Sequence, residues 1–137
     1  VTALMVIDTS ALLAILQNKP ERRSFNAAIE SADTRMISTA TFVEASIVIG
    51  ARYGSDGLRD LDLFIAKAAI ELVPVDVDQA HEARDAHARF GKGRHPAGLN
   101  FGDCFSYALA RVLGEPLLFE GEDFAQTDVS AVPLAHL

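Results

Sequence analysis

The chain has 137 residues, of which 50% are hydrophobic and 23% are charged. This length and composition are typical of one globular domain with its own core, and they argue against a disordered chain. Acidic residues outnumber basic ones by 19 to 12, so the net charge of −7 disfavours binding of nucleic acid or of an anionic membrane by bulk charge alone. An enzyme that acts on nucleic acid remains compatible with this balance, because a metal site needs local acidity.

The distribution of cysteine and of apolar residues indicates a cytoplasmic protein. Cys104 is the only cysteine, so it cannot form an intramolecular disulfide, and we expect it to be a buried structural thiol. The longest apolar runs, 4–7 and 11–16, are far shorter than the roughly 20 residues of a membrane span. We expect one domain over residues 1–137, with residues 1–4 as an upstream start or an expression remnant ahead of Met5.

Apolar runs of two kinds alternate along the chain. Short β-branched runs predict strands at 4–7, 35–38, 71–75, 116–119 and 129–133. Longer runs of helical periodicity predict helices at 11–17, from Pro20 to about residue 30, and at 41–53, 58–70, 78–90 and 102–113. Pro74 predicts that the third strand lies near an edge, and the nearly all-apolar segment 41–53 predicts a helix covered on most sides. This alternation predicts a three-layer α/β/α domain with a central, mainly parallel sheet of four to five strands.

Four acidic residues follow or adjoin the predicted strands at the same end. Asp8 follows the first strand, and Glu44 lies near the start of the helix after the second. Asp103 lies in the first turn of the helix that opens at residue 102, and Asp123 follows the fourth strand. Because ligands of parallel sheets gather beyond the carboxyl ends of the strands, we expect these four carboxylates to meet there.

Helix capping is an alternative interpretation of each of these acids. The segment from Thr41 to Glu44 fits a capping box, in which a threonine and a glutamate satisfy each other's backbone amides. Asp103 near a helix start is favoured by the helix dipole, and Asp8 fits an N-cap. For any one acid the sequence leaves both roles open.

A pocket of carboxylates has a chemical consequence. Two carboxylates about 4 Å apart repel each other by about 4 kcal/mol at an effective dielectric constant near 20. Such a group is either partly protonated or neutralised by a cation, and carboxylates without histidine or cysteine ligands favour Mg²⁺ or Mn²⁺. A metal site of this kind suits hydrolysis of a phosphodiester by a metal-activated water. Ser10 carries a nearby hydroxyl that could support the site or cap a helix.

Four sequence motifs contain the four acids in order: MVIDTSAL at 5–12, TFVEA at 41–45, NFGDCFSYALA at 100–110 and LFEGEDF at 118–124. Together they resemble the motifs of a PIN domain, and most closely those of the VapC toxins of bacterial toxin–antitoxin pairs. The resemblance extends over nearly the whole chain. In the last motif this chain has Glu122 before Asp123, where relatives often have asparagine or aspartate, so Glu122 is a candidate to share the role of Asp123.

The resemblance implies an activity and its partners. It implies a PIN-like fold and a Mg²⁺- or Mn²⁺-dependent endoribonuclease, the toxin of a type II toxin–antitoxin system, with Asp8, Glu44, Asp103 and Asp123 as catalytic residues. Asp8 and Asp103 are expected to bind the metal, and Glu44 and Asp123 to bind it directly or through water. The implied partners are a VapB-type antitoxin, a second copy of the chain and an RNA substrate, either tRNA or rRNA.

A cluster of basic residues precedes the Asp103 helix. Arg84, Arg89, Lys92 and Arg94 are candidates to bind RNA phosphates beside the cleavage site. The alternative is an ordinary solvated helix face and loop.

Three other functions compete with the nuclease. A catalytically inactive PIN fold would act as an RNA- or protein-binding module. A receiver-like regulatory domain would need paired acids after the first strand and a lysine near a late strand, whereas Asp8 is followed by Thr9 and Ser10. A phosphatase of the Asp-x-Asp type would need an acid in place of Ser10.

Asp128 and Thr127 are further candidates to supplement the metal site.

Overall fold

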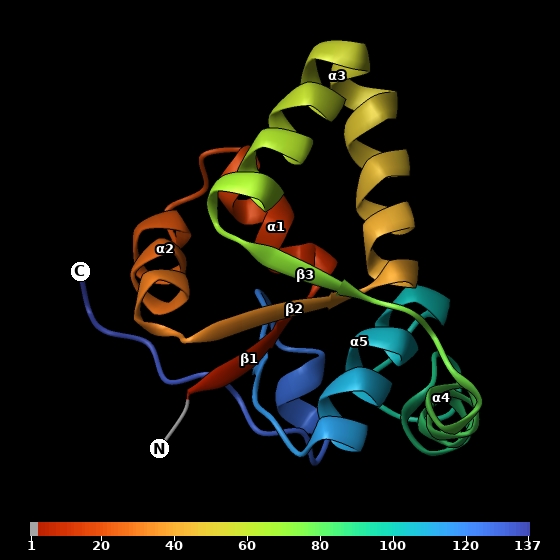
Figure 1. Cartoon of the computed structure of the whole chain (residues 1–137). Coiled ribbons are helices and arrows are strands. Elements are labelled where there is room, and N and C mark those ends of the chain that lie inside the picture. Colours follow the sequence, from red (N-terminus) through yellow and green to blue (C-terminus); the bar gives the residue numbers. More distant parts are fainter. Residues whose placement is uncertain (1–2) are drawn as a thin grey trace.

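The computed structural model describes residues 3–137, and Figure 1 shows how its elements are arranged. Its elements are β1 (Leu4–Ile7), α1 (Thr9–Leu16), α2 (Arg22–Ser31), β2 (Thr34–Ser38), α3 (Thr39–Lys67), β3 (Ile70–Val73), α4 (Val77–Phe90), α5 (Phe101–Leu113), β4 (Leu117–Leu118) and a short 3₁₀ helix, η1 (Phe124–Gln126). Leu4 belongs to β1, and the backbone amide of Ala3 donates to the Asp33 carboxylate at 2.7 Å. Residues 3 and 4 are therefore part of the fold, whereas residues 1–2 lie outside the described part, and an upstream start at residues 1–4 stays a prediction.

The strands form a parallel sheet in the order β3-β2-β1-β4. β3 lies at an edge, as Pro74 predicts. The predicted fifth strand at 129–133 is wrong: in the described part of the chain this segment forms a single bridge between Leu117 and Ala131. The bridge is held by the amides of Leu117 and Val132.

Side chains of the central strands alternate between two hydrophobic cores. Met5 and Ile7 of β1 pack with α1, α2 and α3, whereas Val6 packs with α4 and α5. Leu117 and Leu118 of β4 divide in the same way. The sheet is therefore buried on both faces, and Figure 1 shows α1, α2 and α3 on one side with α4 and α5 on the other. This is the three-layer α/β/α arrangement that the sequence predicts.

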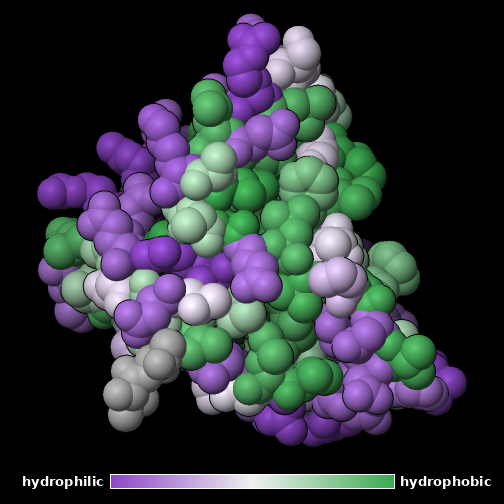
Figure 2. All heavy atoms as spheres, in the orientation of Figure 1, coloured by the Kyte–Doolittle hydropathy of each residue, from purple (hydrophilic) through white to green (hydrophobic). Residues whose placement is uncertain are grey.

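α3 is a helical hairpin that extends beyond the sheet (Figure 1). Its two arms join at Gly54, where φ is 65°, a left-handed conformation that glycine adopts without a steric penalty. The expectation that segment 41–53 is covered on most sides is wrong, because Val43 is 53% exposed and Ile47 is 67% exposed. The arm projects past the core, and in Figure 2 hydrophobic side chains gather over the hairpin. Within residues 3–137, no helix combines the length and apolar character that crossing a membrane requires.

Candidate metal centre at the carboxyl edge of the sheet

Asp8 is a buried carboxylate where β1 passes into α1, and only 2% of its surface is exposed. One carboxylate oxygen accepts the backbone amide of Ser10 at 3.0 Å, which caps α1 as the sequence allows. The other oxygen accepts the hydroxyl of Ser106, on α5, at 2.5 Å. Asp8 is therefore a helix cap, as one interpretation of the sequence predicts, and it also links the start of α1 to α5.

Glu44 does not belong to a capping box. α3 begins at Thr39, two residues earlier than predicted, and its N-cap is Ser38, whose hydroxyl accepts the amide of Ala40 at 3.1 Å. The hydroxyl of Thr41 lies instead 3.1 Å from that of Ser106. One oxygen of Glu44 accepts the hydroxyl of Thr9 at 2.5 Å. The Glu44 carboxylate is thus held beside Asp8 by the residue that follows Asp8 in the chain.

The second Glu44 oxygen lies directly against Gly102, in the first turn of α5. A Cβ atom at Gly102 would be 2.0 Å from this oxygen, far inside van der Waals contact. Glycine therefore lets the carboxylate approach the N-terminus of α5, where the helix dipole favours negative charge. Our sequence reasoning missed this role of Gly102. A signal was available, because a glycine inside a helix is unfavourable unless something needs the space.

The pKa of Asp103 is influenced by the charges of the other three acids. It forms a capping box with Asn100: the Asn100 amide donates to Asp103 at 3.0 Å, and the Asp103 amide donates to the Asn100 side chain at 2.9 Å. The pKa of Asp103 is raised to about 7: burial raises it most, the bond from the Asn100 backbone amide lowers it, and the charges of Asp8, Glu44 and Asp123 also raise it. The four acids therefore share one electrostatic neighbourhood.

Asp123 and Glu122 lie in the loop between β4 and η1, and both are exposed. This loop is attached to α1, because the backbone amide of Glu120 donates to the hydroxyl of Ser10 at 3.0 Å. The hydroxyl of Ser10 therefore anchors the loop near the N-terminus of α1. Ser10 contacts the backbone of the loop, which makes it a positioning residue for this part of the site.

The four acids have no basic partner in the described structure. Its ion pairs engage Asp56, Asp85, Glu120 and Asp128 instead. A set of carboxylates without arginine or lysine partners has the donor chemistry of a hard divalent cation. In residues 3–137, however, no three histidine, cysteine, aspartate or glutamate side chains are placed closely enough to hold a metal ion together. The fold gathers the four charges without bringing them to ligand distance.

Asp128 and one member of the basic cluster, Arg89, bind each other. Arg89 donates to Asp128 at 3.1 Å, and the hydroxyl of Tyr107 donates to the same carboxylate at 2.5 Å. Asp128 therefore ties the C-terminal segment to α4 and α5, and this network satisfies both Asp128 and Arg89. Arg84, Lys92 and Arg94 are exposed.

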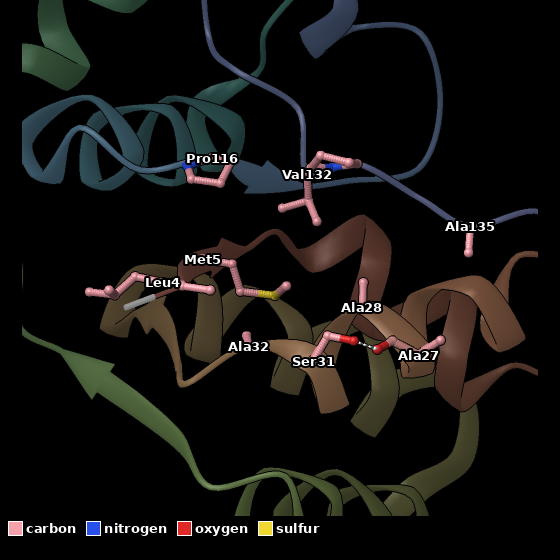
Figure 3. Close-up of a pocket in the computed structure, with 11 residues that line it drawn as sticks. Leu4, Met5, Ala27, Ala28, Ser31, Ala32, Pro116, Val132 and Ala135 are labelled. Atoms are coloured by element: carbon pink, nitrogen blue, oxygen red, sulfur yellow. Dashed lines mark hydrogen bonds between the residues drawn. The ribbon is translucent and has the colours of Figure 1, made fainter. Parts of the chain in front are cut away.

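The pocket drawn in Figure 3 lies at the opposite end of the sheet. Leu4 and Met5, from the start of β1, line it together with Ala28 of α2 and Val132 of the C-terminal segment. Its walls carry no acidic side chain. Asp8, at the other end of β1, does not contribute to this pocket, so we do not assign it to the carboxylate site.

The raised pKa of Asp103 predicts a pH-dependent stability. Because the folded state holds this proton more tightly than the unfolded chain, stability falls as the pH rises from about 4 to about 7. Asparagine at position 103 removes the charge but keeps an oxygen for the Asn100 amide. Without divalent ions at about pH 8, we expect Asp103→Asn to raise the free energy of unfolding by about 1–2 kcal/mol, a value discounted for solvent screening. Urea unfolding measures this, and a gain of the same size near pH 4 would contradict it.

The chain matches a known protein family over most of its length. The PIN domain family model matches residues 5–130. The chain is 55% identical over 130 residues to ribonuclease VapC30 of Mycobacterium tuberculosis, covering 95% of this chain and 99% of that protein. It is 56% identical over 128 residues to a ribonuclease VapC of Mycolicibacterium smegmatis, covering 93% and 99%. These matches exclude the receiver and phosphatase alternatives.

Solved structures share the fold at low sequence identity. Mycobacterium tuberculosis VapC20, described as a toxin that cleaves the sarcin-ricin loop, aligns with a TM-score of 0.75 at 18% identity over 93% of this chain and 98% of that one. A DNA-bound VapBC from Salmonella typhimurium aligns with a TM-score of 0.72 at 19% identity over 97% and 98%. With the matched family model and the mycobacterial relatives, these findings show that the chain belongs to the PIN-domain family, among the VapC ribonucleases.

Proposed function

We propose that the protein is a Mg²⁺- or Mn²⁺-dependent endoribonuclease and the toxin of a type II toxin–antitoxin system. The observation that carries this proposal is the gathering of Asp8, Glu44, Asp103 and Asp123 at one edge of the sheet, where the other three charges raise the pKa of Asp103 and none has a basic partner in the described structure. The names of the mycobacterial relatives support the same activity.

The four acids would divide the work of the site. Asp8 and Asp103 would bind the ion directly, and Glu44 and Asp123 directly or through water, with Glu122 beside them. A bound Mg²⁺ supplies acidity to a coordinated water and screens charge on the phosphate. Thr9 and Ser106 fix the orientations of Glu44 and Asp8 through short hydrogen bonds. These bonds keep the carboxylates in place, which limits the reorganisation that catalysis requires.

The partners follow from the chemistry and from the relatives. The VapBC structures from Salmonella typhimurium and Haemophilus influenzae support a VapB-type antitoxin as partner. The RNA substrate, tRNA or rRNA, would be met in the cytoplasm. Val43 and Ile47 leave an apolar strip on α3 that a second copy of the chain could cover in a homodimer. Arg84, Lys92 and Arg94 are exposed and available to bind phosphates.

Mapping of RNA ends tests the proposal. Purified protein is incubated with total bacterial RNA, with Mg²⁺ or with a chelator, and the new ends are sequenced. The endoribonuclease produces discrete internal cuts with Mg²⁺ and none with the chelator. Uncut RNA in both samples would favour the inactive PIN module, and equal cutting in both would contradict metal dependence.

A further inference from the structure

An apolar groove lies on the surface between α4 and α5, near the acidic site. Its volume is about 350 Å³. Ala83, Arg84 and His87 of α4 form one wall, and Phe101 and Phe105 of α5 form the other.

Phe101 is the most exposed large hydrophobic residue of the described chain, with 79% of its surface accessible. Phe105 supports it from one turn further along α5, with the ring centroids 4.9 Å apart and the ring planes at 73°. Phe105 is itself only half-buried. The pair therefore presents a supported aromatic surface to solvent, which is costly for a side chain that only packs.

The groove adjoins the catalytic acids. Phe101 is the first residue of α5 and Asp103 is the third, so one helical turn carries both. Cys104, the residue that follows Asp103 in the chain, also lines the groove. Phe101 also directly precedes Gly102, against which the Glu44 carboxylate lies, so the backbone of Phe101 adjoins the carboxylate site.

We propose that this groove binds one unpaired nucleobase of the RNA, next to the phosphate that is cleaved, with the base stacked on Phe101. The inference rests on the proposed ribonuclease function and names a recognition element for it. A base has the flat apolar face that the groove accepts, and stacking on aromatic side chains is a general mode of single-strand recognition. Charge complementarity favours the same occupant, because Arg84 on the rim can meet a phosphate that the acidic edge alone would repel.

The test measures binding of a short single-stranded RNA in Mg²⁺ buffer, with the Asp8→Asn substitution in every variant to prevent cleavage. The second probe is the same oligonucleotide with abasic sites throughout. Phe101→Ala is expected to weaken binding of the first RNA about tenfold, the loss typical of one stacked base, and to leave binding of the abasic RNA unchanged. Phe101→Trp should retain the affinity. Leu63→Ala, a half-exposed residue on the second arm of α3, serves as the matched control without effect.

Three outcomes would overturn the base site. They are unchanged affinity in Phe101→Ala, an equal loss for both RNAs, and a change in oligomeric state by light scattering, which would assign Phe101 to a contact between two copies. Failure of the ribonuclease proposal looks different: the RNA would be bound in a base-dependent way, and the chain with Asp8 intact would leave it uncut in Mg²⁺.

Discussion

Asp8→Asn should reduce the rate of RNA cleavage about 10³-fold, because a catalytic metal contributes several kcal/mol and each 1.36 kcal/mol is a factor of ten. Asparagine keeps one oxygen, which can accept the Ser10 amide and so preserve the cap of α1, and its NH₂ group can donate to the Ser106 hydroxyl. What disappears is the negative charge that a divalent cation needs. Initial rates on one RNA that the protein cuts, compared at saturating Mg²⁺, measure the loss.

The matched control for this substitution is Asp56→Asn. Asp56 is an exposed acid on α3 whose ion pair with Arg59 is a surface contact of little energetic weight. The Asp56→Asn variant should cut RNA at the rate of the unsubstituted protein. Circular dichroism and thermal unfolding must show both variants folded. Cleavage by folded Asp8→Asn at the unsubstituted rate would remove Asp8 from the mechanism.

Gly102→Ala should impair cleavage about 10²-fold although it touches no reacting atom. The added methyl group would overlap the Glu44 oxygen at 2.0 Å, so the carboxylate must leave the first turn of α5. A misplaced metal ligand or substrate-positioning group typically costs 10–100-fold in metal affinity or activity. Alanine is a better helix former than glycine, so α5 itself should not be weakened. The rate at a fixed Mg²⁺ concentration and the Mg²⁺ concentration for half-maximal rate both measure the effect.

A second substitution separates displacement of Glu44 from general damage. In Gly102→Ala combined with Glu44→Asp, the shorter side chain withdraws from the new methyl group, and part of the lost activity should return. Gly50→Ala is the control, because a Cβ atom there meets Leu58 only at 3.6 Å, an ordinary contact. If Gly102→Ala is as active as the unsubstituted protein, Glu44 is not held in place by this glycine.

Local patterns predicted the elements well where one residue decides the outcome. Asp8 follows a buried strand and is an efficient cap, so the end of β1 could be read from the sequence, whereas α1 begins at Thr9, two residues before the predicted start at 11. The start of α3 was misplaced because Ser38 and Thr41 are both capping residues. The sequence could not show that Thr41 is occupied by Ser106, 65 residues away. Contacts of this range depend on the whole fold.

The sequence predicted that the four acids lie near one edge of the sheet, and it did not predict the contacts that hold them there. Parallel strands bring the residues after them to one edge, so the gathering of Asp8, Glu44 and Asp123 follows from topology. The contact between Glu44 and Gly102 depends on how α5 approaches α3, which no periodicity encodes. The exposure of Ile47 could not be predicted either. An apolar helix face indicates that some partner covers it, but not whether that partner is another part of the same chain or a second protein.

Calorimetric titration with Mn²⁺ at about pH 7, in two buffers that differ in ionisation enthalpy, examines whether the four acids jointly bind a divalent cation. Because the pKa of Asp103 is about 7, the carboxyl is partly protonated there, and cation binding should release protons. We expect saturable binding with proton release in the unsubstituted protein and at least tenfold weaker binding in Asp8→Asn and in Asp103→Asn. Equal affinity in all three proteins, or no binding by the unsubstituted protein, would contradict a metal centre built from these acids.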